Sequence, residues 1–234
     1  MKRRRLALLS AVLVLGCGAT TPDGLSQFLI MRACATEREL DLPPGIAVAA
    51  IRTERRRNYS MSDYLQDRYL EWILTEHRDA GWWEEWASGN ERVAARNLAI
   101  KVRTGRWPVS VIRSGYIMSF GPAQITPRTA LSACRRLPIV PDCRGTVREL
   151  VVRILGTKAP GSIAATIIAF ERNRFCEGRE KCELSIAELL TLYSVGADIV
   201  LGRLGKIIPG QFAADGARYG FVTAAALECE SLAK

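Results

Sequence analysis

The sequence predicts a mainly α-helical protein with a single domain. Apolar residues recur at helical spacing along almost the whole chain, and Gly or Pro residues interrupt the pattern. Only 108–117, with Val109, Val111 and Ile112, could form a short strand or hairpin. No internal repeat, low-complexity tract or long Gly/Ser linker divides the chain. We therefore expect one core, covered by helices, with at most a minimal β-hairpin.

The expected helices follow from this periodicity. The first spans 25–40 and ends before Leu42-Pro43-Pro44-Gly45, which breaks the pattern. The second spans 46–57, and because its first half is almost entirely apolar we expect it to be buried. Ser62 and Asp63 cap the third helix. Further helices are expected over 82–102, 126–137, 146–155, 162–175, 185–193, 196–204 and 216–228.

The N-terminal segment has the pattern of an export signal. Residues 2–5 are basic, and the apolar run 6–15 is too short to span a bilayer as a helix. The run closes on Val14-Leu15-Gly16-Cys17, which resembles a bacterial lipobox with cleavage before Cys17 and lipid on its thiol. The alternative is an ordinary signal peptide with a chance cysteine. We expect 1–16 to be removed.

The lipobox resemblance also implies a location. Gly18 after the cysteine implies transport to the periplasmic face of an outer membrane, and 17–26 would be a short tether. Loss of residues 2–5 lowers the net charge from +9 to +5. This modest positive excess suits an anionic cell-wall polymer. Nucleic acid is not an expected partner, because an exported, anchored chain does not meet it.

The cysteine count supports export. Six of the seven cysteines remain once Cys17 carries lipid, and an even number in an exported chain suggests up to three disulfides. The preferred pairs are Cys134 with Cys143, Cys176 with Cys182, and Cys34 with Cys229, although other connectivities remain open. Zinc is the alternative, but the sequence has no Cys-x-x-Cys and its only histidine is His77, so we expect no metal.

Three segments resemble, in order, the motifs of the soluble lytic transglycosylase family. Gly121-Pro122-Ala123-Gln124-Ile125-Thr126-Pro127-Arg128-Thr129-Ala130 is similar to the family's Gly-Leu-Met-Gln-Ile-x-Pro-x-Thr-Ala. Upstream, Ile51-Arg52-Thr53-Glu54 stands where the family has its catalytic glutamate. Downstream, Leu192-Tyr193-Ser194-Val195-Gly196 stands where it has Tyr-Asn-x-Gly. The resemblance implies a lysozyme-like domain over 27–234 that cleaves peptidoglycan.

Glu54 is the expected acid. A carboxylic acid can protonate the leaving oxygen of a glycosidic bond if burial raises its pKa, and Glu54 follows an apolar run where a helix should emerge into a cleft. The resemblance implies cleavage between MurNAc and GlcNAc. The same glutamate then acts as base on the C6 hydroxyl, which gives a 1,6-anhydro product. No cofactor is implied, and no second family-matched carboxylate is present, as a two-carboxylate hydrolase would need.

The surroundings of Glu54 depart from the family pattern. Arg55 follows it where the family has Ser, and Arg57 could share its helix face. A guanidinium there would lower the pKa of the acid or hold a substrate carboxylate. Glu54 could instead be a salt-bridged helix residue, and Arg52 with the arginines at 55–57 could be a solvated helix face. Glu171 is a possible second acid without a matching motif.

Two further residues take roles from the resemblance. Gln124 would lie in the cleft and bind an N-acetyl group or backbone, and its alternative is a loop-capping amide. Tyr193 would place its hydroxyl near the catalytic glutamate, and its alternative is a core tyrosine with a satisfied hydroxyl. Ser194 stands in place of the family's Asn.

The spacing between the first two motifs exceeds that of the family. About 66 residues separate Glu54 from Gly121, so we expect an inserted helical element at about 63–105. The insert carries four of the five tryptophans, at 72, 82, 83 and 86. They could stack on sugars or dock the insert onto the core, and we favour docking.

The leading hypothesis is a lytic transglycosylase that acts on peptidoglycan glycan strands and is held at the membrane by lipid on Cys17. A lysozyme-like lipoprotein that binds peptidoglycan or envelope proteins without cutting is the first alternative. A muramidase that hydrolyses the same bond is the second. The sequence indicates no particular protein partner.

Overall fold

The computed structural model describes residues 24–58, 61–76, 80–88, 119–203, 206–218 and 220–232. The expected signal peptide, the lipidation site Cys17 and the hairpin at 108–117 lie outside these residues. So do most of the expected tether and the last part of the insert. Leu25, near the end of the expected tether, is buried in the core.

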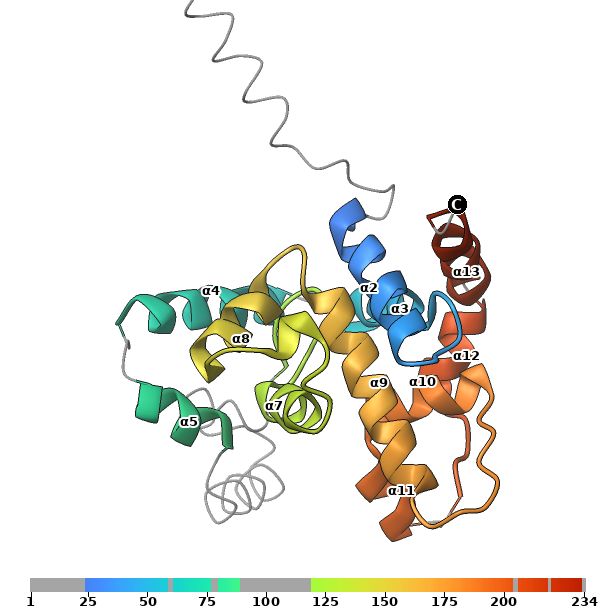
Figure 1. Ribbon diagram of the computed structural model, residues 1–234. Helices are drawn as coiled ribbons and strands as arrows, with labels where there is room; N and C mark the ends of the chain where they lie inside the picture. Colours follow the sequence, from blue (N-terminus) through green and yellow to red (C-terminus); the bar gives the residue numbers. More distant parts are fainter. Residues whose placement is uncertain are drawn as a thin grey trace, which may run out of the picture.

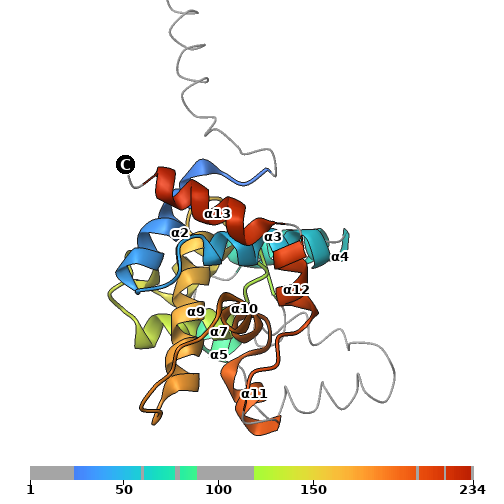
Figure 2. The same ribbon diagram turned by 90° about the vertical axis from the view of Figure 1, so that its right-hand side faces the viewer.

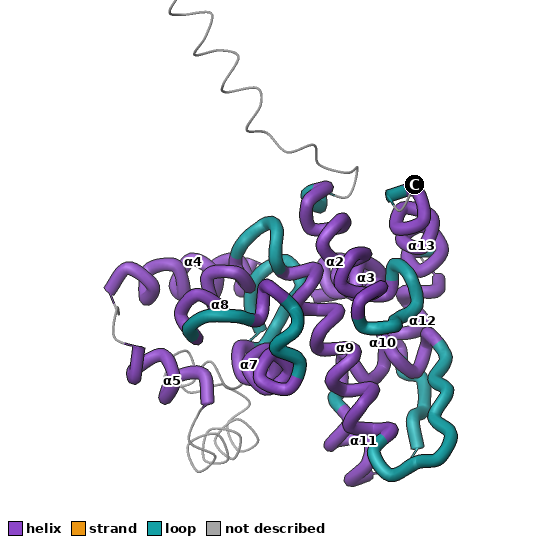
Figure 3. The backbone as a smooth tube through the Cα atoms, viewed as in Figure 1, coloured by secondary structure: helices purple, strands orange, loops and turns teal. Residues whose placement is uncertain are grey.

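Helices form almost all of the described structure. Their bounds are α2 Gln27–Glu39, α3 Ile46–Asn58, α4 Met61–Glu76, α5 Ala80–Ser88, α7 Pro127–Arg136, α8 Val147–Leu155, α9 Pro160–Cys176, α10 Ile186–Val195, α11 Ala197–Arg203, α12 Gln211–Arg218 and α13 Phe221–Ser231, with a 3-10 turn at Pro141–Cys143. The described residues contain no strand, only an isolated bridge between Phe120 and Ile125 (Figure 3). The predicted mainly α class is confirmed.

Helix α9 is the centre of the domain. It packs against α2, α3, α7 and α10, and most of its residues are buried (Figure 1). Helices α2, α3, α12 and α13 lie together on one side of α9, and α4, α5, α7 and α8 lie on the other (Figures 1 and 2). Buried side chains from both groups belong to one continuous hydrophobic core.

Local signals set several helix boundaries. Thr146 and Ser185 begin α8 and α10 with capping boxes, in which Glu149 and Glu188 bond back to the cap residue. The expected helix over 216–228 is wrong. It is two helices, α12 and α13, because Gly220 takes a left-handed conformation with φ of 65° and starts a new helix there.

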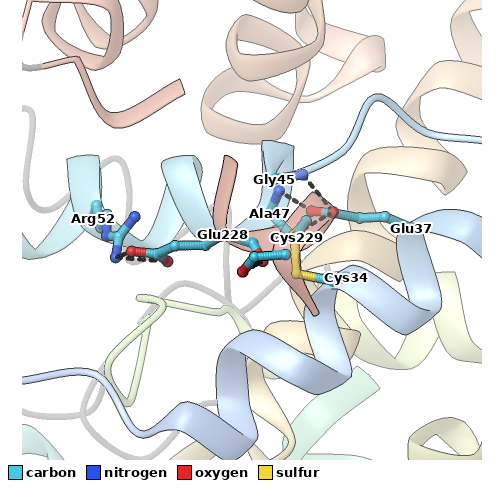
Figure 4. Close-up of a disulfide and its surroundings, with 8 residues drawn as sticks. Cys34, Glu37, Gly45, Ala47, Arg52, Glu228 and Cys229 are labelled. Atoms are coloured by element: carbon cyan, nitrogen blue, oxygen red, sulfur yellow. Dashed lines mark hydrogen bonds and ion pairs between the residues drawn. A yellow bond between two sulfur atoms is a disulfide. The ribbon is translucent and has the colours of Figure 1, made fainter. Parts of the chain in front are cut away.

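All three preferred disulfides are present. Cys34–Cys229 joins α2 to α13, while Cys134–Cys143 and Cys176–Cys182 close short loops. Figure 4 shows the first of these bonds beside Glu37. Cys34, Cys229 and Glu37 also lie close enough to suggest a metal site, but both sulfurs are bonded to each other and supply no thiolate.

The described part of 63–105, the expected insert, docks onto the core, as favoured from the sequence. Trp83 and Trp86 are buried, and the Trp86 ring lies 6.1 Å from that of Phe120. Asp67 of α4 accepts a hydrogen bond from the backbone N–H of Gly121 at 2.8 Å. Trp72, by contrast, is 54% exposed. Helices α4 and α5 therefore contact the segment that carries Phe120 and Gly121.

Among the described residues, no single helix combines the length and the apolar character needed to cross a membrane. Helices α8 and α9 reach both only as a pair, and they are bent by 113° at their break.

Candidate active site

The three motifs meet at one cavity of about 310 Å³, which we call the Glu54 cavity. Helix α3 contributes Glu54, and the turn before α7 contributes Gln124. Helix α9 contributes Ile167 and Glu171, and the end of α10 contributes Tyr193. The remaining lining residues are Ser119, Ile125, Thr126, Thr129, Ser194, Val195 and Gly196. Segments up to 139 residues apart in the sequence, counted from Glu54 to Tyr193, therefore form one site.

Glu54 lies where α3 passes from the core to the cavity. The first six residues of the helix are fully buried, and Thr53 is buried with its hydroxyl bonded to the carbonyl of Ala49 at 2.8 Å. Glu54 is 8% exposed and lines the cavity. A carboxyl group in this position is largely removed from water yet accessible to a ligand, which is the placement that the sequence predicts.

The arginines around Glu54 have separate environments. Arg52 is buried and pairs with Glu228 of α13 at 2.9 Å, so its expected place on a solvated face is wrong (Figure 4). Arg55 lines a different cavity, beside Tyr64 of α4, and Arg56 is exposed. The side chain of Arg57 lies outside the described residues. Neither Arg52 nor Arg55 lines the Glu54 cavity.

A tight turn presents Gln124 to the cavity. Gly121 and Gln124 both have positive φ, at 70° and 49°. A Cβ atom at Gly121 would overlap the carbonyl oxygen of Ile154, so a glycine is required there. The Gln124 amide donates to the Gly121 carbonyl at 3.1 Å and accepts from the Ser119 hydroxyl at 3.0 Å. Gln124 is therefore both the loop-capping amide and a lining residue of the cavity.

Tyr193 connects α10 to the same turn. Its hydroxyl donates to the carbonyl of Ala123 at 2.7 Å, and its ring packs against Phe212. Burial, with a smaller contribution from the charge of Glu54, raises the pKa of Tyr193 well above its usual value. The hydroxyl stays protonated and lies within electrostatic reach of Glu54. The hydroxyl proton is donated to the Ala123 carbonyl. The hydroxyl oxygen can therefore act only as an acceptor toward a protonated carboxyl group.

Glu171 is a second carboxylate on the cavity. It is 4% exposed, accepts the backbone N–H of Ala197 at 2.7 Å, and has the Arg174 guanidinium 3.7 Å away. From the sequence, Glu171 is named only as a possible second acid, because no family motif matches its position. Its bonds hold the start of α11 against α9, which gives it a structural role independent of any chemistry.

The cavity combines groups suited to acid–base chemistry on a neutral polar ligand. It offers a nearly buried carboxyl group, an amide, a tyrosine hydroxyl and several hydroxyl side chains. Comparison of the chain with models of protein families, with characterised proteins and with solved structures finds no match.

Proposed function

We propose that the protein is a peptidoglycan lytic transglycosylase with a lysozyme-like domain. The observation that carries the proposal is the convergence of Glu54, Gln124 and Tyr193 on one cavity from three distant segments. The resemblance to the family at these three positions comes from the sequence alone. Residues that matched the motifs by chance would not be expected to line one cavity. The nearly buried carboxyl group of Glu54, which lines this cavity beyond the buried first half of α3, supports its assignment as acid and base.

The proposed reaction needs one carboxyl group and no water. Protonated Glu54 gives its proton to the glycosidic oxygen, and the bond from that oxygen to C1 of MurNAc breaks. The resulting carboxylate takes the proton of the C6 hydroxyl, whose oxygen forms a bond to C1. The products are a strand ending in GlcNAc and a 1,6-anhydro-MurNAc end. Glu54 is protonated again and ready for another cycle.

Gln124 and Tyr193 act as positioning residues in this proposal. The Gln124 amide is held by Ser119 and Gly121 and keeps a fixed orientation toward the cavity. The Tyr193 hydroxyl is held by Ala123, so its oxygen has a fixed position from which to orient the Glu54 carboxyl group. A lipid on Cys17 would keep the enzyme at the periplasmic face of the outer membrane, close to its polymer.

Hydrolysis by a muramidase mechanism is the second candidate, and Glu171 is the observation that favours it. A hydrolase needs a second carboxylate to activate water, and Glu171 lines the same cavity. Glu171→Gln separates the two candidates, because the glutamine oxygen can still accept the Ala197 N–H that now binds Glu171. Transglycosylation predicts a rate within about fivefold of wild type, and hydrolysis predicts a loss of at least about 100-fold.

The proposal is tested by digestion of sacculi. The oxidised chain from Gly18 onward is incubated with sacculi, and soluble fragments are identified by mass spectrometry. Glu54→Gln is the test variant and Glu39→Gln, at an exposed position of α2, is the matched control. Anhydro-muropeptides from wild type and Glu39→Gln but not from Glu54→Gln support the proposal. Folded protein that binds sacculi and releases nothing would instead identify a non-cleaving binding protein.

A further inference from the structure

The cavity that Arg55 lines is formed by the start of the described chain, by α4 and by the turn before α7. Its volume is about 290 Å³, and its lining residues include Gly24, Arg55, Tyr64, Pro122 and Thr157. Gly24 is the first described residue, and the expected lipidation site Cys17 stands seven residues earlier. An extended chain of that length spans at most about 25 Å. A lipid on Cys17 would therefore hold this cavity, which we call the tether cavity, close to a membrane surface.

Arg55 differs from the other charged residues of the tether cavity. Asp67 already accepts a backbone N–H at 2.8 Å, and Arg68 pairs with Glu71. Arg55 is half-buried, and it makes no hydrogen bond or ion pair with the described residues. A Cβ atom at Gly24 would lie 3.5 Å from Nη2 of Arg55, so the guanidinium is directly beside the start of the domain. A half-buried guanidinium with unused donors favours a phosphate group as its ligand.

Helix α4, which contributes Tyr64 to this cavity, has apolar residues on two faces. The inner face is buried in the core and includes Leu70, Ile73 and Leu74. On the outer face, Tyr64, Leu65 and Trp72 are 49%, 60% and 54% exposed. Arg68 lies on the same face, because positions 64, 65, 68 and 72 fall on one side of an α-helix. Exposed Tyr, Trp and Leu residues beside an arginine are typical of a helix that lies in a membrane interface.

The start of α2 adds to this surface. Phe28 and Met31 are 48% and 45% exposed and lie one turn apart. The Lys158 ammonium is 5.2 Å from the centre of the Phe28 ring. Its neighbour Thr157 lines the tether cavity and accepts a hydrogen bond from the Ser26 hydroxyl. Apolar and basic side chains from two helices therefore surround the cavity. The apolar ones form what we call the tether face, namely Phe28, Met31, Tyr64, Leu65 and Trp72.

We propose that the tether face lies on a phospholipid membrane and that Arg55 binds the phosphate of a phospholipid headgroup in the tether cavity. This inference rests on the proposed lipid on Cys17, which keeps phospholipid within reach of the cavity at high effective concentration. The aromatic and aliphatic side chains enter the interface, while the basic residues Arg68 and Lys158 remain at the level of the phosphates.

The contact would also orient the candidate active site. Pro122 lines the tether cavity, and Gln124 of the same turn lines the Glu54 cavity. A membrane bound at the first cavity therefore fixes the direction in which the second one opens.

Flotation with vesicles tests the tether face without the lipid on Cys17. The oxidised chain from Gly18 onward is mixed with vesicles of phosphatidylethanolamine that contain a minor fraction of phosphatidylglycerol. The test variant is Leu65→Ser with Trp72→Ser. The matched control is Ile139→Ser with Ile208→Ser, at positions that are 64% and 54% exposed and lie outside the tether face. Thermal melting checks that every variant is folded.

The test variant should bind the vesicles at least about tenfold more weakly than wild type, and the control should stay within about twofold. Equal affinities of all three proteins would overturn the inference, as would folded wild type that does not float. Weaker binding of the test variant to sacculi, with unchanged flotation, would assign the outer face of α4 to glycan and also overturn it.

Arg55→Gln tests the headgroup site. Vesicle affinity should fall about fivefold, because one basic residue near an anionic membrane surface is lost. Arg38→Gln, at an exposed position near the other end of α2, is the control and should change the affinity by less than about twofold. An equal effect of both substitutions would contradict a headgroup site at Arg55. Inorganic phosphate that binds as tightly as the vesicles would indicate a site for free anions instead of a lipid.

Tryptophan fluorescence reports the contact of α4 directly. Phospholipids brominated on the acyl chains close to the headgroup should quench part of the wild-type emission. Trp72→Phe should remove most of this quenching and still float, because it keeps an aromatic ring at the interface. Unchanged quenching in Trp72→Phe would place the contact elsewhere and overturn the inference.

The failure of this inference and the failure of the proposed function give different results. Wild type that releases anhydro-muropeptides from sacculi but does not bind vesicles would contradict only the membrane contact. Wild type that binds vesicles through Leu65 and Trp72 but releases nothing from sacculi would support the membrane contact and contradict the proposed enzyme.

Discussion

Two buried glutamates on consecutive helices have opposite surroundings. Glu37 of α2 is fully enclosed, and its two carboxylate oxygens accept the backbone N–H groups of Gly45 and Ala47 at 2.6 and 2.7 Å (Figure 4). Glu54 of α3 is almost as buried but lines an open cavity. Backbone N–H groups therefore bind both oxygens of Glu37, which lies inside the protein. Glu54 instead lines a cavity that a ligand can enter.

Glu37 shows that a raised pKa alone does not identify a candidate catalytic residue. Burial raises the pKa of Glu37 to about 7, more than its two backbone hydrogen bonds lower it. A value near neutrality is what a general acid needs, yet Glu37 lies between α2, α3 and the Cys34–Cys229 disulfide and lines no described cavity. Access to a ligand, rather than burial, therefore distinguishes the candidate acid.

Removal of the Cys34–Cys229 disulfide, which lies beside Glu37, should have the largest effect, and the effect is on stability. Replacing Cys34 and Cys229 by Ala removes a bond between residues 195 apart, which should lower the free energy of unfolding by about 5 kcal/mol on a chain-entropy argument. Replacing Cys176 and Cys182, which are 6 apart, should cost about 2 kcal/mol. Urea unfolding under non-reducing conditions measures both. Equal losses would contradict the role of the first disulfide in closing the domain.

Glu54→Gln should have the next largest effect, and only on activity. Loss of the acid and base should slow the cleavage of sacculi by roughly 1000-fold, equivalent to about 4 kcal/mol in activation free energy. The melting temperature should change by less than about 2 °C, because the amide is close to isosteric. Glu37→Gln is the control, and its activity per folded molecule should match wild type. A large loss of stability in Glu54→Gln would identify Glu54 as a structural residue.

Glu37 should make stability depend on pH. Its pKa in the folded protein is raised above the ordinary value of 4.5, so the folded protein holds this proton more tightly than the unfolded chain does. Its contribution is complete below about pH 4.5 and is lost as pH rises through about 7, a change of roughly 3 kcal/mol. Urea unfolding from pH 5 to 8 measures this slope.

The matching variant is Glu37→Gln, which cannot titrate. Its stability should be nearly flat over the part of that range in which wild type declines. The absolute stability of the variant should also be lower, because the amide nitrogen replaces one of the two acceptors that Gly45 and Ala47 use. A slope identical to that of wild type would assign the pH dependence to another group.

Tyr193→Phe should give the smallest effect. It leaves the buried Ala123 carbonyl without its donor, which should cost about 1–2 kcal/mol of stability. Activity should fall severalfold if, as proposed, the Tyr193 hydroxyl orients the Glu54 carboxyl group. Tyr64→Phe, at a position that is 49% exposed, is the control and should change neither quantity. An unchanged rate for Tyr193→Phe would remove its proposed positioning role.

Local sequence signals predicted what depends on near neighbours. The expected helices begin at 146 and 185, and Thr146 and Ser185 are the N-caps of α8 and α10. The cap expected at Ser62 and Asp63 is wrong, because α4 already begins at Met61. The short cysteine spacings predicted two disulfides, and elimination then gave the third. The apolar first half of α3 predicted its burial and the emergence of Glu54.

Features that depend on distant partners were not predictable in this way. Arg52 is buried because Glu228 pairs with it from 176 residues away. Glu171 was named only as a possible second acid without a matching motif, and its place on the cavity depends on the packing of α9 against α3 and α10. The break between α12 and α13 depends on the left-handed backbone of Gly220, whereas Gly216 four residues earlier stays helical. Residue type alone does not distinguish Gly216 from Gly220.

The most direct test of the central claim is digestion of sacculi in water enriched in ¹⁸O. If Glu54 alone serves as acid and base, wild type should release 1,6-anhydro-muropeptides that contain no ¹⁸O, and Glu54→Gln should release none. Reducing-end products that carry ¹⁸O would contradict the account and indicate hydrolysis with a second carboxylate. No product from folded wild-type protein would contradict it as well.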